Sequence, residues 1–440
     1  MIIPLDADSI ALAKNPQLRE EAAGYLQIQE DFYGQVRRLG FEFASKSDPV
    51  QPKEQLERLK QGGAIFLNGG RSIHVGRLSP ACRACEKGIG SRTFFISFQC
   101  NRDCYFCFNH AMKDYGYYLQ HERDAKADLY ALAEKTPGLQ FVGLSGGEPL
   151  LHPEKVIDFF QTARTLFPEA YTRLYTNGDF VDSSILRALS KAGLNEIRFS
   201  IKMEDFYEGK TIFDSLVSAN EHHLVTMVEM PIEPGTEGVM QGILRNLNQI
   251  GIFGINLLEM LCSLVHPGAY KERGYLIKNP PWSVLYDYWY PGTLPIAGSE
   301  AACLNLLEYA LEGGLKLGVH YCSGENKHTA QLFRQNAGGP IPKTHTFSEN
   351  SYFLVSAKVY GKDAMEVLRA FQRSGFQKFR FDPASRILEF PVGMVPTLPN
   401  PDMQVGIATS TLERSNGEVL LRELRVDLTT PRIFDAERDV

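Results

Sequence analysis

The sequence has no excess of basic residues, no long apolar run and few cysteines for its length. Its 46 lysines and arginines are outnumbered by 52 acidic residues, and no basic cluster stands out. Proteins that bind nucleic acid typically carry a basic patch, so we expect no nucleic-acid partner. No apolar run approaches membrane-spanning length, and the first residues lack the basic start and long apolar core of a signal peptide. We therefore expect a cytoplasmic protein without a membrane partner.

Eight cysteines in 440 residues are too few for a disulfide scaffold. In a reducing cytosol such cysteines are typical of ligand chemistry instead. The remaining composition, 44% hydrophobic and 22% charged with no low-complexity tract, indicates a globular chain. Its length predicts more than one domain with ample core.

Three of the cysteines lie on one short loop, Cys100, Cys104 and Cys107, in the spacing C-x3-C-x2-C. The loop follows an apolar, aromatic run over residues 93–98, which predicts a buried strand. Three thiolates can hold three irons of a [4Fe–4S] cubane and leave the fourth iron open for a ligand. The loop therefore predicts a cluster that binds a ligand rather than one that only stores electrons.

A zinc site is the alternative that the cysteine spacing leaves open. The pairs Cys82-x2-Cys85 and Cys104-x2-Cys107 are eighteen residues apart. This spacing also fits a four-cysteine zinc ribbon, which would make the protein a non-enzymatic binding module.

The cysteine loop resembles the signature of the radical S-adenosylmethionine (SAM) superfamily, with Phe106 in the aromatic position of C-x3-C-x-aromatic-C. A second motif, Leu144-Ser-Gly-Gly-Glu-Pro149, resembles the GGEP motif of that superfamily, whose backbone helps to bind the amino group of SAM. Gly146 and Gly147 let the main chain approach a ligand closely, while Glu148 can accept from an ammonium group or fix the turn. Without the cysteines, the same motif would simply be a turn.

Strand and helix patterns alternate from Arg92 to about Cys322, which predicts a parallel sheet with crossover helices. The strand candidates are 93–98, 139–144, 171–176, 196–201, 224–230, 252–258 and 317–321. The repeat resembles the partial (β/α)6 TIM-type barrel of the superfamily. We expect an α/β fold with three domains: an N-terminal helical and loop extension (1–91), the barrel (92–335) and a small α+β domain (340–440).

Polar residues at further strand ends are candidate SAM contacts, because ligands gather at the carboxyl ends of parallel strands. Asn177, Ser200 and Glu229 lie at the ends of the third, fourth and fifth candidate strands. The resemblance implies contacts from this region to the ribose or carboxylate of SAM. The alternatives are that Asn177-Gly178 is only a turn and that Ser200 faces the core.

Four more cysteines are candidates for an auxiliary metal site. Cys82 and Cys85 precede the first barrel strand, Cys262 follows the sixth and Cys322 ends the seventh. They could hold a second iron–sulfur cluster or zinc, or they could be a structural knuckle or buried free thiols. Cys303 lies at an apolar position of a helix and is expected in the core.

The resemblance implies an enzyme that reductively cleaves SAM at a [4Fe–4S] cluster and uses the 5′-deoxyadenosyl radical to abstract hydrogen from a substrate. It implies a reductant such as flavodoxin or ferredoxin. The ninety-odd residues before the cysteine loop favour a peptide or protein substrate. Activation of a glycyl-radical enzyme and modification of a small molecule or RNA are the alternatives. No cysteine follows Cys322, so the cysteine-rich C-terminal pattern of SPASM peptide maturases is absent.

Overall fold

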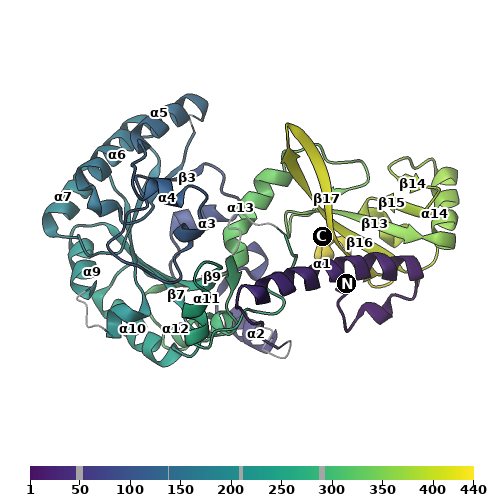
Figure 1. Cartoon of the computed structure of the whole chain (residues 1–440), viewed down its shortest axis with the longest axis horizontal. Helices are drawn as coiled ribbons and strands as arrows, with labels where there is room; N and C mark the ends of the chain where they lie inside the picture. The colour runs from purple at the N-terminus through teal and green to yellow at the C-terminus, as the bar shows by residue number, and fades with distance from the viewer. Residues whose placement is uncertain (46–52, 137, 208–211, 287–292) are drawn as a thin grey trace. The chain divides into compact units, whose positions relative to one another are not determined.

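A computed structural model describes residues 1–45, 53–136, 138–207, 212–286 and 293–440 of the chain (Figure 1). Contacts divide the chain into two compact units. We call Leu39–Trp282 with Tyr288–His328 the barrel unit, and Met1–Arg38, Ser283–Asp287 and Thr329–Val440 the C-terminal unit. The predicted domain boundaries, 1–91, 92–335 and 340–440, differ from this division and stay a prediction.

The barrel unit contains a nine-stranded sheet in the order β1-β2-β11-β8-β7-β6-β5-β4-β3. Every neighbouring pair from β3 through β8 to β11 is parallel, while β2 runs antiparallel to both β11 and β1. All seven predicted strands are confirmed within a few residues. The strands are β1 (Ile65–Leu67), β2 (Ser72–Val75), β3 (Ser91–Phe95), β4 (Phe141–Ser145), β5 (Tyr171–Thr176), β6 (Glu196–Ser200), β7 (Val225–Ile232), β8 (Gly254–Glu259) and β11 (Gly318–Cys322).

Helices follow most of these strands and cover the outside of the sheet, as Figure 1 shows for α5, α6, α7, α9, α10 and α12. This arrangement agrees with the partial TIM-type barrel that was predicted. Pro153 begins α6 as expected, and the Asp182 side chain caps α7 by accepting from the backbone N–H groups of Ser184 and Ile185. The helices of this part are α2 (Lys53–Gln61), α3 (Pro80–Cys85), α4 (Tyr115–Tyr118), α5 (Ala125–Lys135), α6 (Pro153–Leu166), α7 (Ser183–Lys191), α8 (Met203–Tyr207), α9 (Ile212–Glu221), α10 (Glu237–Ile250), α11 (Pro267–Glu272) and α12 (Ser299–Glu312). The division of the chain falls within α13 (Gly324–Asn336), of which Thr329–Asn336 belongs to the C-terminal unit. The short elements are β9 (Leu261–Ser263), β10 (Thr293–Pro295), η2 (Asn68–Gly70), η3 (Phe108–Ala111) and η4 (Pro149–Leu151).

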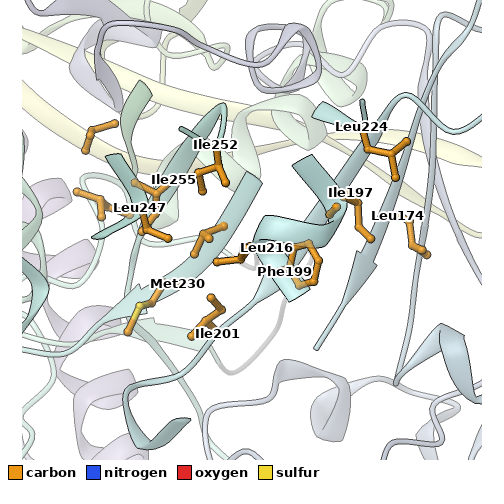
Figure 2. Packing of buried hydrophobic residues seen from close by; sticks show 14 of the residues in the cluster. Leu174, Ile197, Phe199, Ile201, Leu216, Leu224, Met230, Leu247, Ile252 and Ile255 are labelled. Carbon is orange, nitrogen blue, oxygen red and sulfur yellow. The ribbon is translucent and has the colours of Figure 1, made fainter. Parts of the chain in front are cut away.

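The two faces of the sheet differ in polarity, because successive side chains of a strand point to opposite faces. Apolar residues such as Leu174, Ile197 and Ile255 are fully buried with residues of the covering helices, including Leu216 and Leu247 (Figure 2). The alternate positions form the inner face of the sheet, and many of them are polar. They include Arg173, Arg198, Glu229, Asn256 and His320. The hydrophobic core thus lies between sheet and helices, and the inner face is left for polar chemistry.

Residues 65–75, which were predicted as part of a helical and loop extension, form two strands instead. Ile73 and Val75 are buried on one face of β2, while Ser72 and His74 lie on the other. This four-residue alternation between glycine-rich loops is too short to be recognised as a strand without the neighbouring β11. The expected helices of the N-terminal region are present as α1 (Pro16–Arg38) and α2, after the short η1 (Ile10–Leu12).

The C-terminal unit is built on an antiparallel sheet in the order β14-β15-β13-β16-β17, with β12 also pairing with β13. Two elements, α14 and η5, each connect strands that have another strand between them, which is the arrangement of a split β-α-β fold. Two hairpins, β14–β15 and β16–β17, are present, and Asn416 and Gly417 have the positive φ angles (52° and 85°) of a tight two-residue turn. The elements are β12 (Thr346–Phe347), β13 (Leu354–Tyr360), α14 (Gly361–Ser374), β14 (Arg380–Asp382), β15 (Ile387–Phe390), η5 (Val392–Thr397), β16 (Val405–Ser415), β17 (Glu418–Thr429) and α15 (Ala436–Asp439).

Helix α1 packs on the sheet of this unit. Leu18 and Ala22 of α1 form a buried cluster with Tyr360, Ala408 and Val426. The aromatic run at 285–291 falls largely outside the described residues, since only Leu285 and Tyr286 of it are described. In the described part of the chain, none of the helices has both the length and the apolar character needed to span a bilayer.

Candidate metal and cofactor site

The three-cysteine loop begins at the carboxyl end of β3. The rings of Phe95 and Phe98 stack with centroids 4.6 Å apart, and the backbone N–H of Phe98 donates to Tyr118 O at 2.9 Å. These contacts hold the base of the loop against the chain that follows it. A turn then brings the last two cysteines together, because the N–H of Cys107 donates to Cys104 O at 2.9 Å.

The Gly-Gly pair of the second motif packs directly on the cysteine loop. The N–H of Gly147 donates to Ser97 O at 3.0 Å, and the N–H of Glu148 donates to Gln99 O at 2.7 Å. A Cβ on Gly147 would lie 1.9 Å from Gln99 O, and a Cβ on Gly146 would lie 2.6 Å from Ser97 O. Gly146 also has a φ of 122°, which side chains rarely adopt. The glycines thus let the motif approach the cysteine loop closely. The sequence had predicted a close approach to a ligand instead.

The buried carboxylate of Glu148 fastens this turn to the neighbouring strand. It accepts from Leu150 N at 3.0 Å, from Thr176 Oγ1 at 2.7 Å and from Asn177 N at 2.6 Å. Burial raises the pKa of Glu148, and these three donors oppose that shift. Of the two roles open for Glu148, the structure shows the second, fixing the turn.

Arg102, between the first two cysteines, was not singled out from the sequence. Its guanidinium pairs with Asp179 at 2.5 Å and with Asp205 at 2.8 Å, and the Arg102 side chain is only 6% exposed. Asp179 and Asp205 lie just beyond the ends of β5 and β6. The loop is therefore fastened to three successive strands of the sheet by Gly147, Glu148 and Arg102. A lone arginine in a loop gives no sequence signal for this role.

The three thiols lie close enough to influence one another electrostatically. Burial and the charges of Cys107 and Cys100 together raise the pKa of Cys104 to about 11, against the opposing charge of Lys202. Burial also raises the pKa of Cys100 and of Cys107. Cys100 is exposed and the other two are half-buried, so all three can be reached from outside. The N–H of Arg102 points at Cys100 Sγ from 3.4 Å, a contact that favours a thiolate.

The residues present fit a [4Fe–4S] cluster. Metal binding displaces the thiol protons, and the N–H donor, Lys202 and Arg102 favour the resulting negative charge on sulfur. Among the described residues, no three His, Cys, Asp or Glu side chains are arranged to hold a single metal ion. The four-cysteine zinc ribbon is therefore not formed there.

The remaining candidate residues lie at or near the same end of the sheet. Phe106 is half-buried and packs edge-on against Tyr105, with ring centroids 5.1 Å apart. The Asn177 side chain donates to Asn101 Oδ1 at 2.7 Å and lies 3.9 Å from Cys100 Sγ. Ser200 is exposed at the end of β6, so the core alternative for it is wrong. Contacts of Phe106, Gly146, Gly147, Asn177 and Ser200 with SAM stay predictions.

Glu229 belongs to a buried polar network on the inner face. Its carboxylate accepts from Arg198 and, at 2.7 Å, from Asn256 Nδ2. Asn256 Oδ1 in turn lies 2.7 Å from His320 Nδ1. Burial lowers the pKa of His320 to about 3, so its ring is neutral near neutral pH. Glu229 is thus held by groups of the chain, and its contact with SAM or substrate also stays a prediction.

The four cysteines predicted as ligands of an auxiliary metal site do not all lie together. Cys82 receives hydrogen bonds from Arg198 and Asn256, while Cys322 lies near both Cys82 and Cys85. Cys262 is instead buried in β9 beside Tyr270. Three of the four proposed ligands therefore gather on the inner face, and Cys262 is not among them.

Comparison with known proteins gives a match of residues 94–208 to the family described as the radical SAM superfamily. A protein of Methanocaldococcus jannaschii, provisionally named a glycyl-radical enzyme activating enzyme, is 27% identical over 264 residues, which are 58% of this chain and 66% of the relative. The S-adenosyl-L-methionine-dependent 2-deoxy-scyllo-inosamine dehydrogenase of Niallia circulans is 28% identical over 35% of this chain and 60% of its own. Among solved structures, SuiB of Streptococcus suis bound to its precursor peptide SuiA matches 53% of each chain with a TM-score of 0.33 and 14% identity. The chain thus spans at most about two thirds of the length of these curated relatives.

Proposed function

The chain is a member of the radical SAM superfamily through its domain at residues 94–208, and on this premise we propose that it is an enzyme that reductively cleaves SAM and transfers the resulting radical to a substrate. The observation that carries the proposal is the fastening of a three-cysteine loop to the ends of three parallel strands. When bound there, a [4Fe–4S] cluster supplies the electron that breaks the sulfonium bond of SAM and one iron on which SAM is held.

The residues of the chain hold and orient these groups. Cys100, Cys104 and Cys107 are the proposed cluster ligands, and Arg102 keeps their loop in place through Asp179 and Asp205. The GGEP turn, rigid because Glu148 is buried and fully engaged, presents its backbone beside the loop. Phe106 offers a partly exposed ring for the adenine. We infer that Asn177, Ser200 and Glu229 form the wall where the rest of SAM and the substrate bind.

The substrate that we favour is a peptide or protein. The M. jannaschii relative is named for activating a glycyl-radical enzyme, which is a protein substrate. The C-terminal unit also has an edge strand, β17, with the exposed apolar residues Val419, Leu420 and Leu421. Such an edge can pair with an extended polypeptide. A flavodoxin or ferredoxin is the proposed reductant.

Cleavage of SAM is tested with protein purified and reconstituted without oxygen. We expect the wild type to convert SAM to 5′-deoxyadenosine and methionine when dithionite is added, and Cys104→Ala to lose this activity while keeping its circular dichroism spectrum. Cys303→Ala is the matched control, because Cys303 is fully buried in α12 away from the loop. Wild-type cleavage by Cys104→Ala would overturn the assignment.

The substrate class is tested with fractions of an extract from the source organism. We expect the high-mass fraction to stimulate 5′-deoxyadenosine formation, and we expect protease treatment of that fraction to abolish the stimulation. Stimulation by the low-mass filtrate would assign a small molecule, and sensitivity to ribonuclease would assign RNA. Either of these results would reject a polypeptide substrate without affecting the proposed SAM chemistry.

A further inference from the structure

Cys82, Cys85 and Cys322 form a second group of thiols on the inner face of the barrel sheet. Cys82 and Cys85 lie three residues apart on α3, so both can face the same side of that helix. Cys322 is the last residue of β11 and lies on the same face of that strand as His320. The His320 ring contacts Asn256, which donates to Cys82, so β11 brings Cys322 toward that thiol. The charges of Cys82 and Cys85 also raise the pKa of Cys322. The three thiols therefore come together from two segments that are far apart in the sequence.

Helix α3 is fixed against the sheet by polar contacts at its first turn. Ser79 caps the helix, and its hydroxyl donates to Glu196 at 2.6 Å and accepts from Arg198 Nη2 at 3.1 Å. Both Glu196 and Arg198 belong to β6 and are buried. The positions of Cys82 and Cys85 are thus determined by the sheet, as ligands of a built site would be.

Burial raises the pKa of all three thiols, and that of Cys322 to about 12, while nearby donors and cations oppose this shift. Arg198 Nη2 and Asn256 Nδ2 donate to Cys82 Sγ at 3.3 and 3.4 Å, and Asn326 Nδ2 donates to Cys322 Sγ at 3.3 Å. Arg173 and Arg198 face Cys85, and Lys327 faces both Cys85 and Cys322. Hydrogen bonds to sulfur and nearby positive charge are the means by which proteins stabilise and tune thiolate-bound clusters.

The other two cysteines outside the loop lie elsewhere, Cys303 in α12 and Cys262 in β9. Cys303 faces the carboxylates of Glu259 and Glu300, and these raise its pKa along with burial. Cys262 is buried beside Tyr270. The Cys85 side chain, in contrast, is exposed, so iron can reach it. Cys82 and Cys322 thus have guanidinium or amide donors on their sulfur atoms, and Cys85 is exposed.

We propose that Cys82, Cys85 and Cys322 bind a second [4Fe–4S] cluster, whose fourth iron is left for a non-cysteine ligand on the inner face. A cluster suits these residues better than one zinc ion, because in the described part of the chain no three ligand side chains surround a single ion. A cubane binds one thiolate at each iron, so its ligands are held farther apart. The site goes beyond the proposed function, because it does not involve the SAM-binding loop.

The test counts iron in the full chain after anaerobic reconstitution and desalting. We expect about eight irons per wild-type chain, and about four in a variant with Cys82, Cys85 and Cys322 all changed to Ala. We also expect about four when Cys100, Cys104 and Cys107 are changed instead, and the wild-type count in Cys303→Ala. The dithionite-reduced loop variant should keep an electron paramagnetic resonance signal from the second cluster.

Cys85→Ser serves as a milder variant, because its exposed side chain can be changed without opening the core. We expect it to lose or alter the signal that the loop variant keeps. The inference is overturned if the wild type holds about four irons that all depend on Cys100, Cys104 and Cys107, or if Cys82, Cys85 and Cys322 bind zinc. That first result would leave the proposed function intact. Four irons that depend only on Cys82, Cys85 and Cys322 would instead reject the proposed function.

Discussion

At position 147 there is no room for a single added methyl group. A Cβ there would lie 1.9 Å from the backbone oxygen of Gln99, and a backbone atom cannot move aside as a flexible side chain can. We expect Gly147→Ala to displace the cysteine loop at a cost of about 1–3 kcal/mol, and so to weaken iron retention roughly tenfold or more. Iron content and 5′-deoxyadenosine formation measure the effect.

Gly238 provides the matched control for this substitution. It lies in α10, and an added Cβ would meet no atom within 4 Å. Gly238→Ala should leave iron content unchanged and slightly stabilise the helix. Equal iron retention by both variants would show that the Gly147 contact does not position the loop.

His320 connects the stability of the barrel unit to pH. Burial lowers its pKa from the ordinary value of 6.5 to about 3, and the charges of His74 and Arg198 add to the shift. Below about pH 6.5 the His320 ring binds a proton in the unfolded state but not in the folded state. The contribution of this ring to the free energy of unfolding is therefore fully present above that pH and falls as pH decreases toward 3. The slope for one such group is up to about 1.4 kcal/mol per pH unit.

We expect His320→Gln to flatten this dependence, since glutamine can replace the ring's hydrogen bonds to Ser72 and Asn256 without titrating. Urea unfolding at several pH values between 7 and 4.5 measures it. The free-energy difference between wild type and variant should shrink as pH falls. A constant difference would show that His320 titrates normally.

Individual residues were predictable from the sequence only where a motif marks them. Cys100, Cys104, Cys107 and the Gly-Gly-Glu turn follow from their spacing. The partners of Glu229 do not follow from the sequence. Its position in β7 indicates which face of the sheet it occupies, but not that Arg198 and Asn256 reach it from neighbouring strands. Arg102 was missed for the same reason.

Arg102 joins the cysteine loop to the ends of β5 and β6. Asp205 is fully buried, so removing the guanidinium would take the cationic partner away from a buried carboxylate that also accepts from the backbone N–H of Lys202. We expect Arg102→Met to cost about 3–5 kcal/mol in the stability of this region and to reduce iron retention. Arg102→Lys should keep the positive charge but restore only part of the stability and iron retention. An ammonium group cannot pair with both carboxylates in the forked geometry of a guanidinium.

Iron content after desalting measures the loss of iron retention, and thermal unfolding of the iron-free protein measures the loss of stability. Arg438→Met is a control, since Arg438 pairs on the surface with Asp439 at the end of the chain. An Arg102→Met variant that retained iron as well as the Arg438 variant would contradict the positioning role.

Elements were predictable where hydrophobic periodicity is strong. Each barrel strand carries apolar residues at alternate positions, and the turn at Asn416-Gly417 requires the positive φ angles that these residues adopt readily. β1 and β2 escaped prediction because they are short. β2 is a strand by pairing with β11, which comes from a distant part of the chain, and β1 pairs with β2.

The C-terminal unit depends on the first helix of the chain. Leu18 of α1 is fully buried against Ala408 and Val426 of the sheet. We expect Leu18→Ala to destabilise this unit by about 2–5 kcal/mol. Hydrogen exchange should show lost protection in β13 and β16, while β4 to β8 in the barrel unit keep theirs.

Leu12→Ala is the control, because Leu12 is 52% exposed and its loss should change stability by no more than about 0.5 kcal/mol. Loss of protection throughout both units in Leu18→Ala would show instead that the chain unfolds as one cooperative body. The predicted boundary at residue 91 could not anticipate α1's partners, since amphipathic spacing shows that a helix has an apolar face but not which sheet covers it.

The packing of α1 also determines the order in which the chain can mature during its synthesis. Its sheet partners are translated more than three hundred residues later, so at ordinary elongation rates the apolar stripe of α1 waits on the order of tens of seconds. The barrel unit is complete before that pairing can occur. The apolar stripe of α1 is therefore exposed on the nascent chain until the strands that cover it have been synthesised.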